Sequence, residues 1–329
     1  MAFGAMASDT DWRPTATREA LAARAAMLAQ ARAFLVERGA VEVETPALSS
    51  AAAPDPHLTS LAVDAPGGRR YLHTSPEYPL KRLVAAGFGD CFALAKVWRG
   101  GELGPRHQPE FTMLEWYRVG WDHRRLMVEV AELIAALLAP RRALAAPEVV
   151  TYRDAFRQRL GLDPHNAPEL GLDALLAGAG FDAQLELDRD AKLDLLASHL
   201  VYPQLGQGRV TLLSEFPASQ CALARVRPAR DGEPAVAERF EAFVAGIELA
   251  NGYHELADPV EQRTRFERAN ELRRARGLPE SPLDERFLAA LASGLPDCAG
   301  VALGVDRVVM LALGAVTLDE VVAFPWTRA

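Results

Sequence analysis

The sequence predicts an α+β fold in which helices flank an antiparallel β-sheet. Its predicted strands follow one another in hairpins and do not alternate with helices in the βαβ rhythm that builds a parallel sheet. The chain has 329 residues, of which 50% are apolar and 24% are charged, so its composition is that of an ordinary globular protein. We therefore exclude disordered and fibrous classes, and the length allows one large or two modest domains.

The first predicted element is a helix over residues 17–38. It follows a loose leader over residues 1–16, Thr17 is a suitable N-cap residue, and Gly39 can end the helix. Apolar side chains recur along it at heptad spacing, at Leu21, Leu28 and Leu35. We expect this stripe to pack against a partner surface.

Short strands and a second helix are predicted next. Residues 41–44 alternate between apolar and acidic side chains, as a half-buried strand does. A helix begins in the segment Ser75–Glu77, with the serine as its cap and Pro76 in the first helical position. Residues 92–99 and 111–118 are typical of two strands joined by a glycine-rich loop. These two strands form the first predicted hairpin.

The second half of the chain contains further regular segments. A helix is predicted over residues 126–138, and residues 239–250 are typical of a strand. A helix around residues 262–276 is followed by a passage from strand to helix over residues 300–313. The chain has no internal repeat, so no repeat architecture is predicted.

Composition excludes several classes of protein. The three cysteines are far apart in sequence, so we expect neither a disulfide scaffold nor a cysteine zinc site, and a cytoplasmic, reducing compartment fits. The seven histidines are scattered, and no two are spaced to face each other on one helix. No apolar run approaches the roughly 18 residues of a membrane span, and no signal peptide is expected. The net charge is −8, so the chain lacks the overall excess of basic residues that is typical of a nucleic-acid-binding protein.

The hairpin over residues 92–118 carries the first group of candidate site residues. Period two places four side chains on one face of its second strand: Phe111, Met113, Glu115 and Tyr117. A buried glutamate is costly unless it meets a cation, and Arg99 closes the partner strand. One interpretation is a structural Arg–Glu pair. The interpretation we favour is a floor for a flat ligand and a cationic group, with Arg106 and His107 closing over it.

The segment Glu248–Glu255 carries the second group. It contains Asn251–Gly252, a strong signal for a two-residue hairpin turn, because both turn residues must adopt positive φ. Such a turn would place Glu248 opposite Glu255, and two facing carboxylates repel each other unless a cation lies between them. We therefore expect a divalent cation or an ammonium group there, the alternative being a solvent-facing acidic edge.

The third group is Gly300–Arg307, which precedes an apolar helix. Glycines between β-branched residues indicate that another group approaches the backbone closely. Arg307 is unusual at the start of a helix, because a cation opposes the helix dipole there. An anionic or aromatic ligand near Arg307 would explain its presence.

Together these segments resemble the catalytic core of the class II aminoacyl-tRNA synthetases, in the lysyl branch. Residues 39–46 resemble motif 1, which forms the dimer interface in that family, residues 98–117 resemble motif 2, and residues 300–307 resemble motif 3. The runs 74–78 and 248–255 resemble parts of the family's amino-acid pocket. The resemblance implies a homodimer whose subunits each contain a sheet-based catalytic core.

A narrower resemblance is to the ligases that attach (R)-β-lysine to elongation factor P. Lysyl-tRNA synthetases carry an N-terminal OB domain that reads the anticodon, whereas here we expect a single catalytic domain over residues 17–329. Residues 216–220 and 296–298 are similar to those of the ligases, as are Ala250 and Ala302, where lysyl-tRNA synthetases usually have glycine. The resemblance implies that ATP activates (R)-β-lysine, or lysine, and that the acyl group passes to a lysine of elongation factor P. Neither tRNA nor a membrane is expected as a partner.

The resemblance also implies a role for each candidate residue. Arg99 is the implied catalytic residue, which grips the α-phosphate and the substrate carboxylate. The implied amino-acid site consists of Ser75, Pro76, Glu77, Glu115, Tyr117, Glu255 and Ala302. The implied ATP site consists of Arg99, Gly100, Gly101, Glu102, His107, Gln108, Phe111, Glu248, Leu249, Gly304 and Arg307, with adenine between Phe111 and Arg307. Glu248 and Glu255 would hold Mg²⁺.

One position departs from the family pattern. The lysyl-type motif 2 reads Arg-Asn-Glu, whereas this chain reads Arg99-Gly100-Gly101-Glu102, so that the glutamate is displaced by one residue. Either the glycines let Glu102 take the same place or the adenine contact is lost. The alternatives to a protein-modifying ligase are a lysyl-type tRNA ligase without an anticodon domain and a non-catalytic synthetase-like regulatory module.

Overall fold

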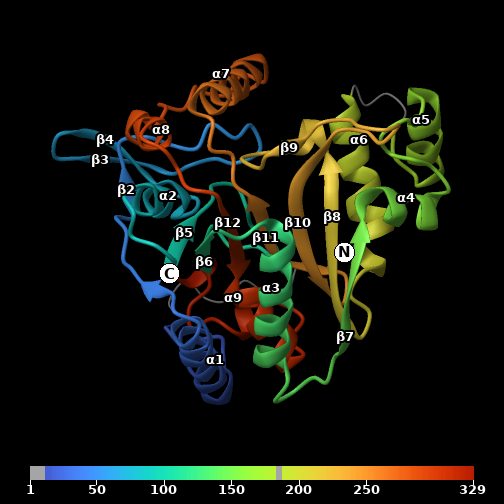
Figure 1. Ribbon diagram of the computed structural model, residues 1–329. Helices are drawn as coiled ribbons and strands as arrows, with labels where there is room; N and C mark the ends of the chain where they lie inside the picture. Colours follow the sequence, from blue (N-terminus) through green and yellow to red (C-terminus); the bar gives the residue numbers. More distant parts are fainter. Residues whose placement is uncertain (1–11, 183–186) are drawn as a thin grey trace.

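A nine-stranded sheet forms the centre of the computed structural model, which describes residues 12–182 and 187–329 (Figure 1). Along the sheet the strands follow the order β1 (Val41–Glu42), β5 (Cys91–Trp98), β6 (Glu110–Val119), β12 (Cys298–Gly304), β11 (Ile247–His254), β10 (Val236–Val244), β8 (Arg209–Pro217) and β7 (Ala145–Thr151), and β9 (Val226–Arg227) pairs with β10. The pairs inside the sheet are antiparallel, as predicted. The pairs at its two edges, β1–β5 and β7–β8, are parallel.

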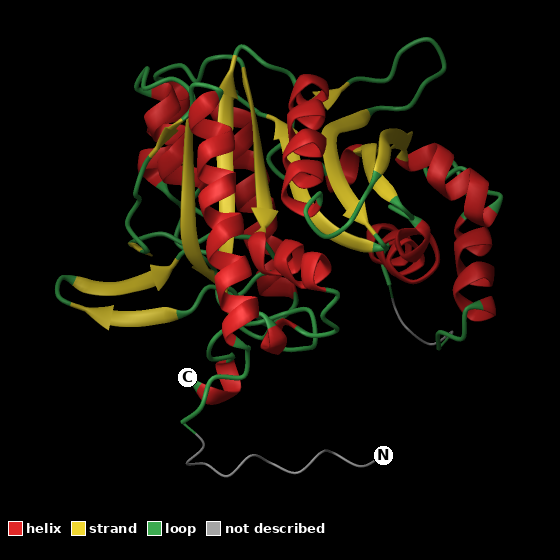
Figure 2. Cartoon of the chain, turned by 90° about the horizontal axis from the view of Figure 1, so that it is seen from below, coloured by secondary structure: helices red, strands yellow, loops and turns green. Residues whose placement is uncertain are grey.

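Helices cover the sheet in three groups. In chain order they are α1 (Arg18–Glu37), α2 (Glu77–Ala85), α3 (His123–Leu138), α4 (Tyr152–Leu160), α5 (Glu169–Gly178), α6 (Arg189–Leu196), α7 (Pro259–Ala275), α8 (Glu285–Ala292) and α9 (Val305–Leu313). The largest apolar cluster lies where α1, α3 and α9 pack together and against the sheet (Figures 1 and 2). The helices α2 and α8 pack together beside β5 and β6, and α4 packs on β8.

A small second sheet stands apart from the central one. It consists of β2 (Leu48–Ser49), β4 (Gly68–Leu72) and β3 (Ala62–Ala65), and the β3–β4 hairpin projects from the body of the molecule (Figure 2). Among the described residues, no helix is long and apolar enough to cross a membrane.

The predicted helices lie close to their expected positions. Helix α1 follows Thr17, whose hydroxyl accepts a hydrogen bond from the N–H of Ala20 (3.2 Å), and α3, α7 and α9 match the segments predicted from the sequence. The apolar stripe of α1 was only partly correct, because Leu21 and Leu28 are half-buried and only Leu35 is fully buried. The buried face of α1 consists of Ala23, Met27, Ala31, Phe34 and Leu35.

The first predicted hairpin is confirmed: β5 lies one residue earlier than expected, and β6 extends one residue further at each end. The predicted strand over residues 41–44 is shorter, since only Val41 and Glu42 pair with β5. The predicted start of α2 moves by one residue, because Pro76 is the cap and Glu77 the first helical residue. The hydroxyl of Ser75 still accepts a hydrogen bond from the N–H of Glu77, at 3.0 Å.

The turn predicted at Asn251–Gly252 is wrong. These residues lie inside β11, paired with Glu241 and Phe240 of β10, and the two-residue turn lies at Ala245–Gly246, where both residues have positive φ. Gly252 is required for another reason: a Cβ atom there would lie 2.5 Å from Cζ of Phe240. The Asn-Gly pair therefore marks tight packing within a strand and not a reversal of the chain.

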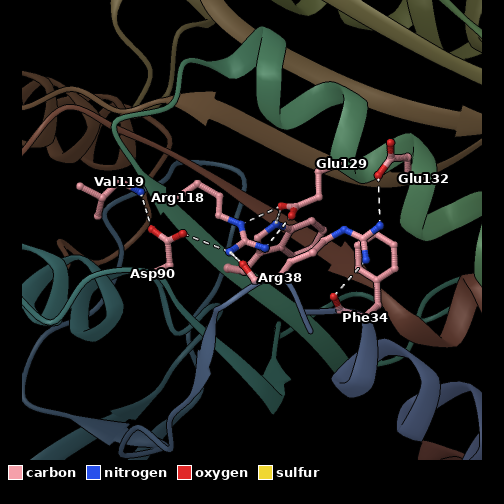
Figure 3. Close-up of polar contacts among 8 residues, drawn as sticks. Phe34, Arg38, Asp90, Arg118, Val119, Glu129 and Glu132 are labelled. Carbon is pink, nitrogen blue, oxygen red and sulfur yellow. Dashed lines mark hydrogen bonds and ion pairs between the residues drawn. The ribbon is translucent and has the colours of Figure 1, made fainter. Parts of the chain in front are cut away.

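A buried ion cluster joins the sheet to α3. Arg118 of β6 is 1% exposed, and its guanidinium contacts the carboxylates of Glu129 (2.5 Å) and Asp90 (3.1 Å) (Figure 3). It also donates to the backbone carbonyl of Arg38, just after α1. Glu129 accepts a further hydrogen bond from the indole N–H of Trp116 (2.9 Å). Every charge in this cluster has a partner, as burial requires.

Part of the predicted loose leader is held in place. The backbone N–H of Thr15 donates to the carbonyl of Ala323 (3.0 Å), and its hydroxyl donates to the carbonyl of Val322 (3.1 Å). The remainder of the predicted leader, residues 1–11, lies outside the described residues.

Candidate active site

The predicted site residues lie on the face of the sheet opposite α3. Side chains alternate between faces along each strand, so residues paired across neighbouring strands share a face. The pairing between β6, β12 and β11 forms two adjacent rows, Tyr117–Gly300–Tyr253 and Glu115–Ala302–Asn251. Three small residues of β12 therefore form the floor of this face: Gly300, Ala302 and Gly304.

Gly300 is small because its neighbours leave no room for a side chain. A Cβ atom at this position would overlap the ring of Tyr117 and would lie 2.5 Å from Oε1 of Glu255. At Gly304, by contrast, a Cβ atom would meet only the carbonyl oxygen of Leu249, at 3.9 Å. The space above Gly304 is therefore open, and the space above Gly300 is filled by the side chains of the site.

Buried carboxylates form one end of the site. Glu115 accepts hydrogen bonds from the hydroxyls of Ser75 (2.5 Å) and Tyr117 (2.8 Å). Lys81 of α2 lies between Glu77 (2.5 Å) and Glu255 (2.6 Å) and is fully buried. Three carboxylates thus lie around a single lysine, which contacts two of them.

This imbalance of charge perturbs the protonation equilibria. Burial raises the pKa of Glu115, and the carboxylate of Glu77 raises it further. Burial likewise raises the pKa of Glu255, although Lys81 partly opposes the shift. Burial by itself would lower the pKa of Lys81, but the carboxylates of Glu255 and Glu77 outweigh burial and raise it. A bound cation would therefore find acidic groups whose charge it can stabilise.

A β-bulge places Glu248 on this same face. Ala242 of β10 pairs with Ala250, whereas the next residue, Phe243, pairs with Glu248, so two residues of β11 oppose one of β10. Without the bulge, residues seven apart on one strand would point to opposite faces. With it, Glu248 and Glu255 point to the same face from the two ends of β11. They do not face each other across a turn, as the sequence had suggested.

One predicted ATP-site residue, Leu249, faces away from the site. The side chain of Leu249 is 2% exposed and packs in the cluster beneath α3 and α9, so it contributes only its backbone to the site. Ala250 packs in the same cluster and is likewise 2% exposed. Ala250 therefore faces away from Ala302, which pairs with Glu115 and Asn251 on the face of the candidate site.

Cationic and aromatic groups form the other end of the site. The guanidinium of Arg99 lies over the ring of Phe111, 5.1 Å from its centroid. Arg307, in the first turn of α9, donates to the carbonyl of Glu248 (3.0 Å) and lies 2.7 Å from Nε2 of His107. It also donates to the carbonyl of Arg106, at 3.3 Å. These contacts join the loop of the segment that resembles motif 2 to the start of α9, where the segment that resembles motif 3 ends.

The predicted ATP-site residues in the loop between β5 and β6 make different kinds of contact. Glu102 lies 3.8 Å from Arg99, so the displaced glutamate stays beside the arginine predicted to be catalytic. Gly100 pairs with Thr59, where a Cβ atom would lie 3.2 Å from the carbonyl oxygen, and Gly101 has a φ of +84°. The amide of Gln108, in contrast, is engaged by Asp319 (2.7 Å) and the N–H of Trp326 (2.9 Å). Gln108 therefore ties the loop to the C-terminal segment.

Of the two predicted magnesium ligands, Glu248 fits an ion bound together with phosphates, but Glu255 does not share that ion. The two residues lie at opposite ends of β11, roughly 20 Å apart at about 3.3 Å per residue, so no single ion can contact both. Glu248 is 40% exposed, and Glu255 is buried with its Oε1 lacking a hydrogen-bond partner. Within the described part of the chain, neither Glu248 nor Glu255 belongs to a group of three or more histidine, cysteine or acidic side chains placed closely enough to share a metal ion. Mg²⁺ commonly takes one or two protein carboxylates and completes its octahedron with phosphate oxygens and water.

Sequence analysis missed three residues of this face. Lys81 is the cation that contacts Glu77 and Glu255, and its spacing of four residues from Glu77 at the start of α2 is the signal that could have indicated it. Arg239 pairs with Glu241 beside Asn251, and their spacing of two residues on one strand is the signal that could have indicated this pair. The Oδ1 atom of Asn251 is buried without a hydrogen-bond partner, next to Ala302.

Comparisons with known proteins agree with this geometry. The family model described as tRNA synthetases class II (D, K and N) matches residues 7–328. The chain is 47% identical over 332 residues to the elongation factor P–(R)-β-lysine ligase of Klebsiella pneumoniae strain 342, covering 98% of this chain and 100% of the relative. It is 46% identical over 330 residues to the protein of the same name from Vibrio cholerae, again covering 98% and 100%. With the ligase of Vibrio vulnificus it shares 47% identity over 327 residues, or 97% and 99% of the two chains.

Proposed function

The chain belongs to the class II tRNA synthetases of the D, K and N type, and from this we propose that it is an ATP-dependent ligase that attaches (R)-β-lysine to elongation factor P. Relatives that align along nearly the whole chain carry the name of this ligase. The observation that carries the proposal is the acidic end of the site, where Glu77, Glu115 and Glu255 lie around one buried lysine.

The acidic end selects a substrate with two amines. An amino acid with two ammonium groups neutralises the excess carboxylates around Lys81. A neutral or acidic amino acid would leave buried negative charge unpaired, which costs roughly 3–5 kcal/mol when one partner of a buried pair is missing. Tyr117 and Ser75 hold Glu115 in place for one ammonium group, and Glu255 offers its unpartnered Oε1 to the other.

The cationic end serves the activation step. In that step a carboxylate oxygen of the substrate attacks the α-phosphorus of ATP, a new P–O bond forms, and the bond to the pyrophosphate breaks. Arg99 neutralises the charge that develops on the α-phosphate, and adenine lies between Phe111 and Arg307. Mg²⁺ held by Glu248 would supply further neutralisation of the phosphates when bound. The site acts by positioning and charge, and it uses no covalent nucleophile.

The transfer step uses an amine from the acceptor protein. The neutral ε-amine of a lysine attacks the carbonyl carbon of the adenylate, a C–N bond forms, the C–O bond to AMP breaks, and the nitrogen loses a proton. Helix α7 offers few free charges for docking an acidic partner, because four of its arginines hold internal contacts. Arg268 and Arg276 are exposed and available for this contact.

Acceptor choice is the decisive experiment. ATP–pyrophosphate exchange is measured with (R)-β-lysine, α-lysine, aspartate and asparagine, and acyl transfer is then followed by the mass of elongation factor P and by charging of total tRNA. We expect exchange with the diamino acids alone, and a mass increase on elongation factor P without charging of tRNA. Arg99→Ala should abolish exchange. Charging of tRNA would instead support a lysyl-type tRNA ligase, and absence of exchange with every amino acid would support a non-catalytic module.

We also propose that the chain forms a homodimer through its motif 1 region in a reducing cytoplasm. Strand β1 lies at an edge of the sheet, and apolar side chains are exposed at Val41 (49%) and at Val36 of α1 (56%). The three cysteines are free thiols, which suits a reducing compartment. Light scattering should give twice the chain mass of 35.7 kDa at micromolar concentration, and a monomer would contradict the proposal.

A further inference from the structure

A second cluster of ligating side chains lies on the opposite face of the sheet from the candidate active site. One nitrogen or oxygen atom from each of His123, Glu238 and His254 lies within 4.8 Å of the others. Among the described residues this is the only group of three or more histidine, cysteine or acidic side chains placed so closely. His123 begins α3, which packs on β10 and β11, the strands that carry the other two residues (Figure 1).

The His123 ring is buried without satisfying its polar atoms. The residue is 5% exposed, and its Nδ1 has no hydrogen-bond partner. A buried polar atom without a partner costs roughly 1–3 kcal/mol. Burial lowers the pKa of His123. The rings of His123 and His254 are stacked, with an angle of 27° between their planes and 6.1 Å between their centroids.

The His254 ring is already oriented by a second set of contacts. Its Nδ1 lies 2.6 Å from Glu238, inside the cluster, and its Nε2 lies 2.9 Å from Asp297 on the outer side. Arg225 in turn holds Asp297 at 2.6 Å. A carboxylate on the outer nitrogen is the arrangement that fixes the tautomer of a metal-binding histidine and raises its basicity.

We propose that His123, Glu238 and His254 form a zinc site that fastens the start of α3 to β10 and β11. Two imidazoles and one carboxylate are ligands that suit Zn²⁺, whereas Mg²⁺ and Ca²⁺ prefer oxygen alone. Bonds of about 2.0–2.1 Å in a tetrahedron separate ligand atoms by about 3.4 Å, which these side chains can reach by small rotations. Three protein ligands leave the fourth position to water.

The site is independent of the proposed ligase chemistry. His254 and Glu255 are consecutive but point to opposite faces of the sheet, and Glu255 belongs to the other face. The zinc site therefore stabilises the fold, and variants at His123 and Glu238 should leave ATP–pyrophosphate exchange in Mg²⁺ buffer unchanged.

The test is metal binding by full-length, tag-free protein that has first been stripped with a chelator and dialysed. Titration with Zn²⁺ should show one ion per chain, and Co²⁺ should produce the intense visible absorption of a four-coordinate site. His123→Ala and the nearly isosteric Glu238→Gln should each weaken Zn²⁺ binding at least 100-fold. The control variant His57→Ala, at an exposed histidine, should bind Zn²⁺ with the affinity of the wild-type protein. Zinc should raise the thermal unfolding midpoint of the unchanged protein and of His57→Ala only.

The exchange activity and the circular dichroism of each variant establish that it is folded, so a loss of binding can be assigned to the lost ligand. The proposal is overturned if the unchanged protein binds no stoichiometric Zn²⁺ at micromolar concentration. It is equally overturned if folded Glu238→Gln and His123→Ala bind Zn²⁺ as tightly as His57→Ala does.

Discussion

Two glycines of β12 offer a direct test of how the site is built, because the same substitution should have different effects at each. Neither Gly300 nor Gly304 has a positive φ, so alanine is compatible with the backbone at both positions. At Gly300 the added methyl group would overlap the ring of Tyr117 and lie 2.5 Å from Oε1 of Glu255. At Gly304 it would meet only a carbonyl oxygen at 3.9 Å.

The magnitude for Gly300→Ala follows from what must move. Tyr117 and Glu255 are 2% and 1% exposed, so neither can turn toward solvent. Overpacking of this kind costs about 1–3 kcal/mol. Displacing Tyr117 also removes its hydrogen bond to the buried Glu115, which adds about 1–3 kcal/mol. We expect Gly300→Ala to lower the free energy of unfolding by about 2–6 kcal/mol.

Gly304→Ala is the matched control on the same strand. Its free energy of unfolding should be unchanged or raised by about 0.4–1 kcal/mol, because alanine restricts the unfolded chain. Its methyl group faces the proposed nucleotide, so the KM for ATP should rise. Gly300→Ala should instead lower kcat/KM for (R)-β-lysine, because it disturbs the acidic end of the site.

Urea denaturation and ATP–pyrophosphate exchange measure both effects. The reasoning is refuted if Gly300→Ala keeps its stability and its kcat/KM for the amino acid. It is also refuted if the two variants lose stability equally, because the methyl-sized space at Gly304 would then not differ from that at Gly300.

Three further predictions use other parts of the structure. Ala302→Gly removes a methyl group beside Glu115, so the ratio of kcat/KM for α-lysine to that for (R)-β-lysine should rise by roughly 10–200-fold, and an unchanged ratio would place the discrimination elsewhere. Burial and Glu77 raise the pKa of Glu115 to about 8, so the folded state binds this proton more tightly than the unfolded state, and the stability of the ligand-free protein should fall between about pH 4.5 and pH 8. Glu115→Gln should flatten that decline in urea denaturation at pH 5.5 and 8.5, and an equally steep decline would contradict this assignment. Glu129→Ala leaves the buried Arg118 without its closest partner and should cost about 3–5 kcal/mol, whereas the exposed Glu132→Ala should cost less than about 1 kcal/mol in the same assay (Figure 3).

Local patterns in the sequence determined the segments that carry the site. The alternation of Phe111, Glu115 and Tyr117 on one strand depends only on the geometry of an extended chain, and the structure confirms it. The start of α1 at Thr17 follows from its cap. The helices α4–α6 and the strands β2–β4 and β8 were not predicted, because their burial is decided by packing between distant segments.

The turn at Asn251–Gly252 shows where local reasoning fails. The pair has the composition of a hairpin turn, but the ring of Phe240 and the pairing with β10 and β12 hold it inside a strand. The bulge that brings Glu248 to the face of Glu255 is likewise a property of paired strands. The sequence of β11 alone does not reveal this bulge, because a bulge is defined by two residues of one strand opposing one residue of the neighbouring strand.

The sequence by itself determined the fold class, the family resemblance and most of the residues proposed to bind substrate, because motifs and period-two patterns are local. Only the tertiary structure decided which groups share a space. Lys81 meets Glu255 across 174 positions (255 − 81), and His123 approaches His254 across 131 (254 − 123). Neither pair leaves a spacing signal in the chain, because contacts between distant segments depend on how the sheet orders its strands and on which face each helix covers.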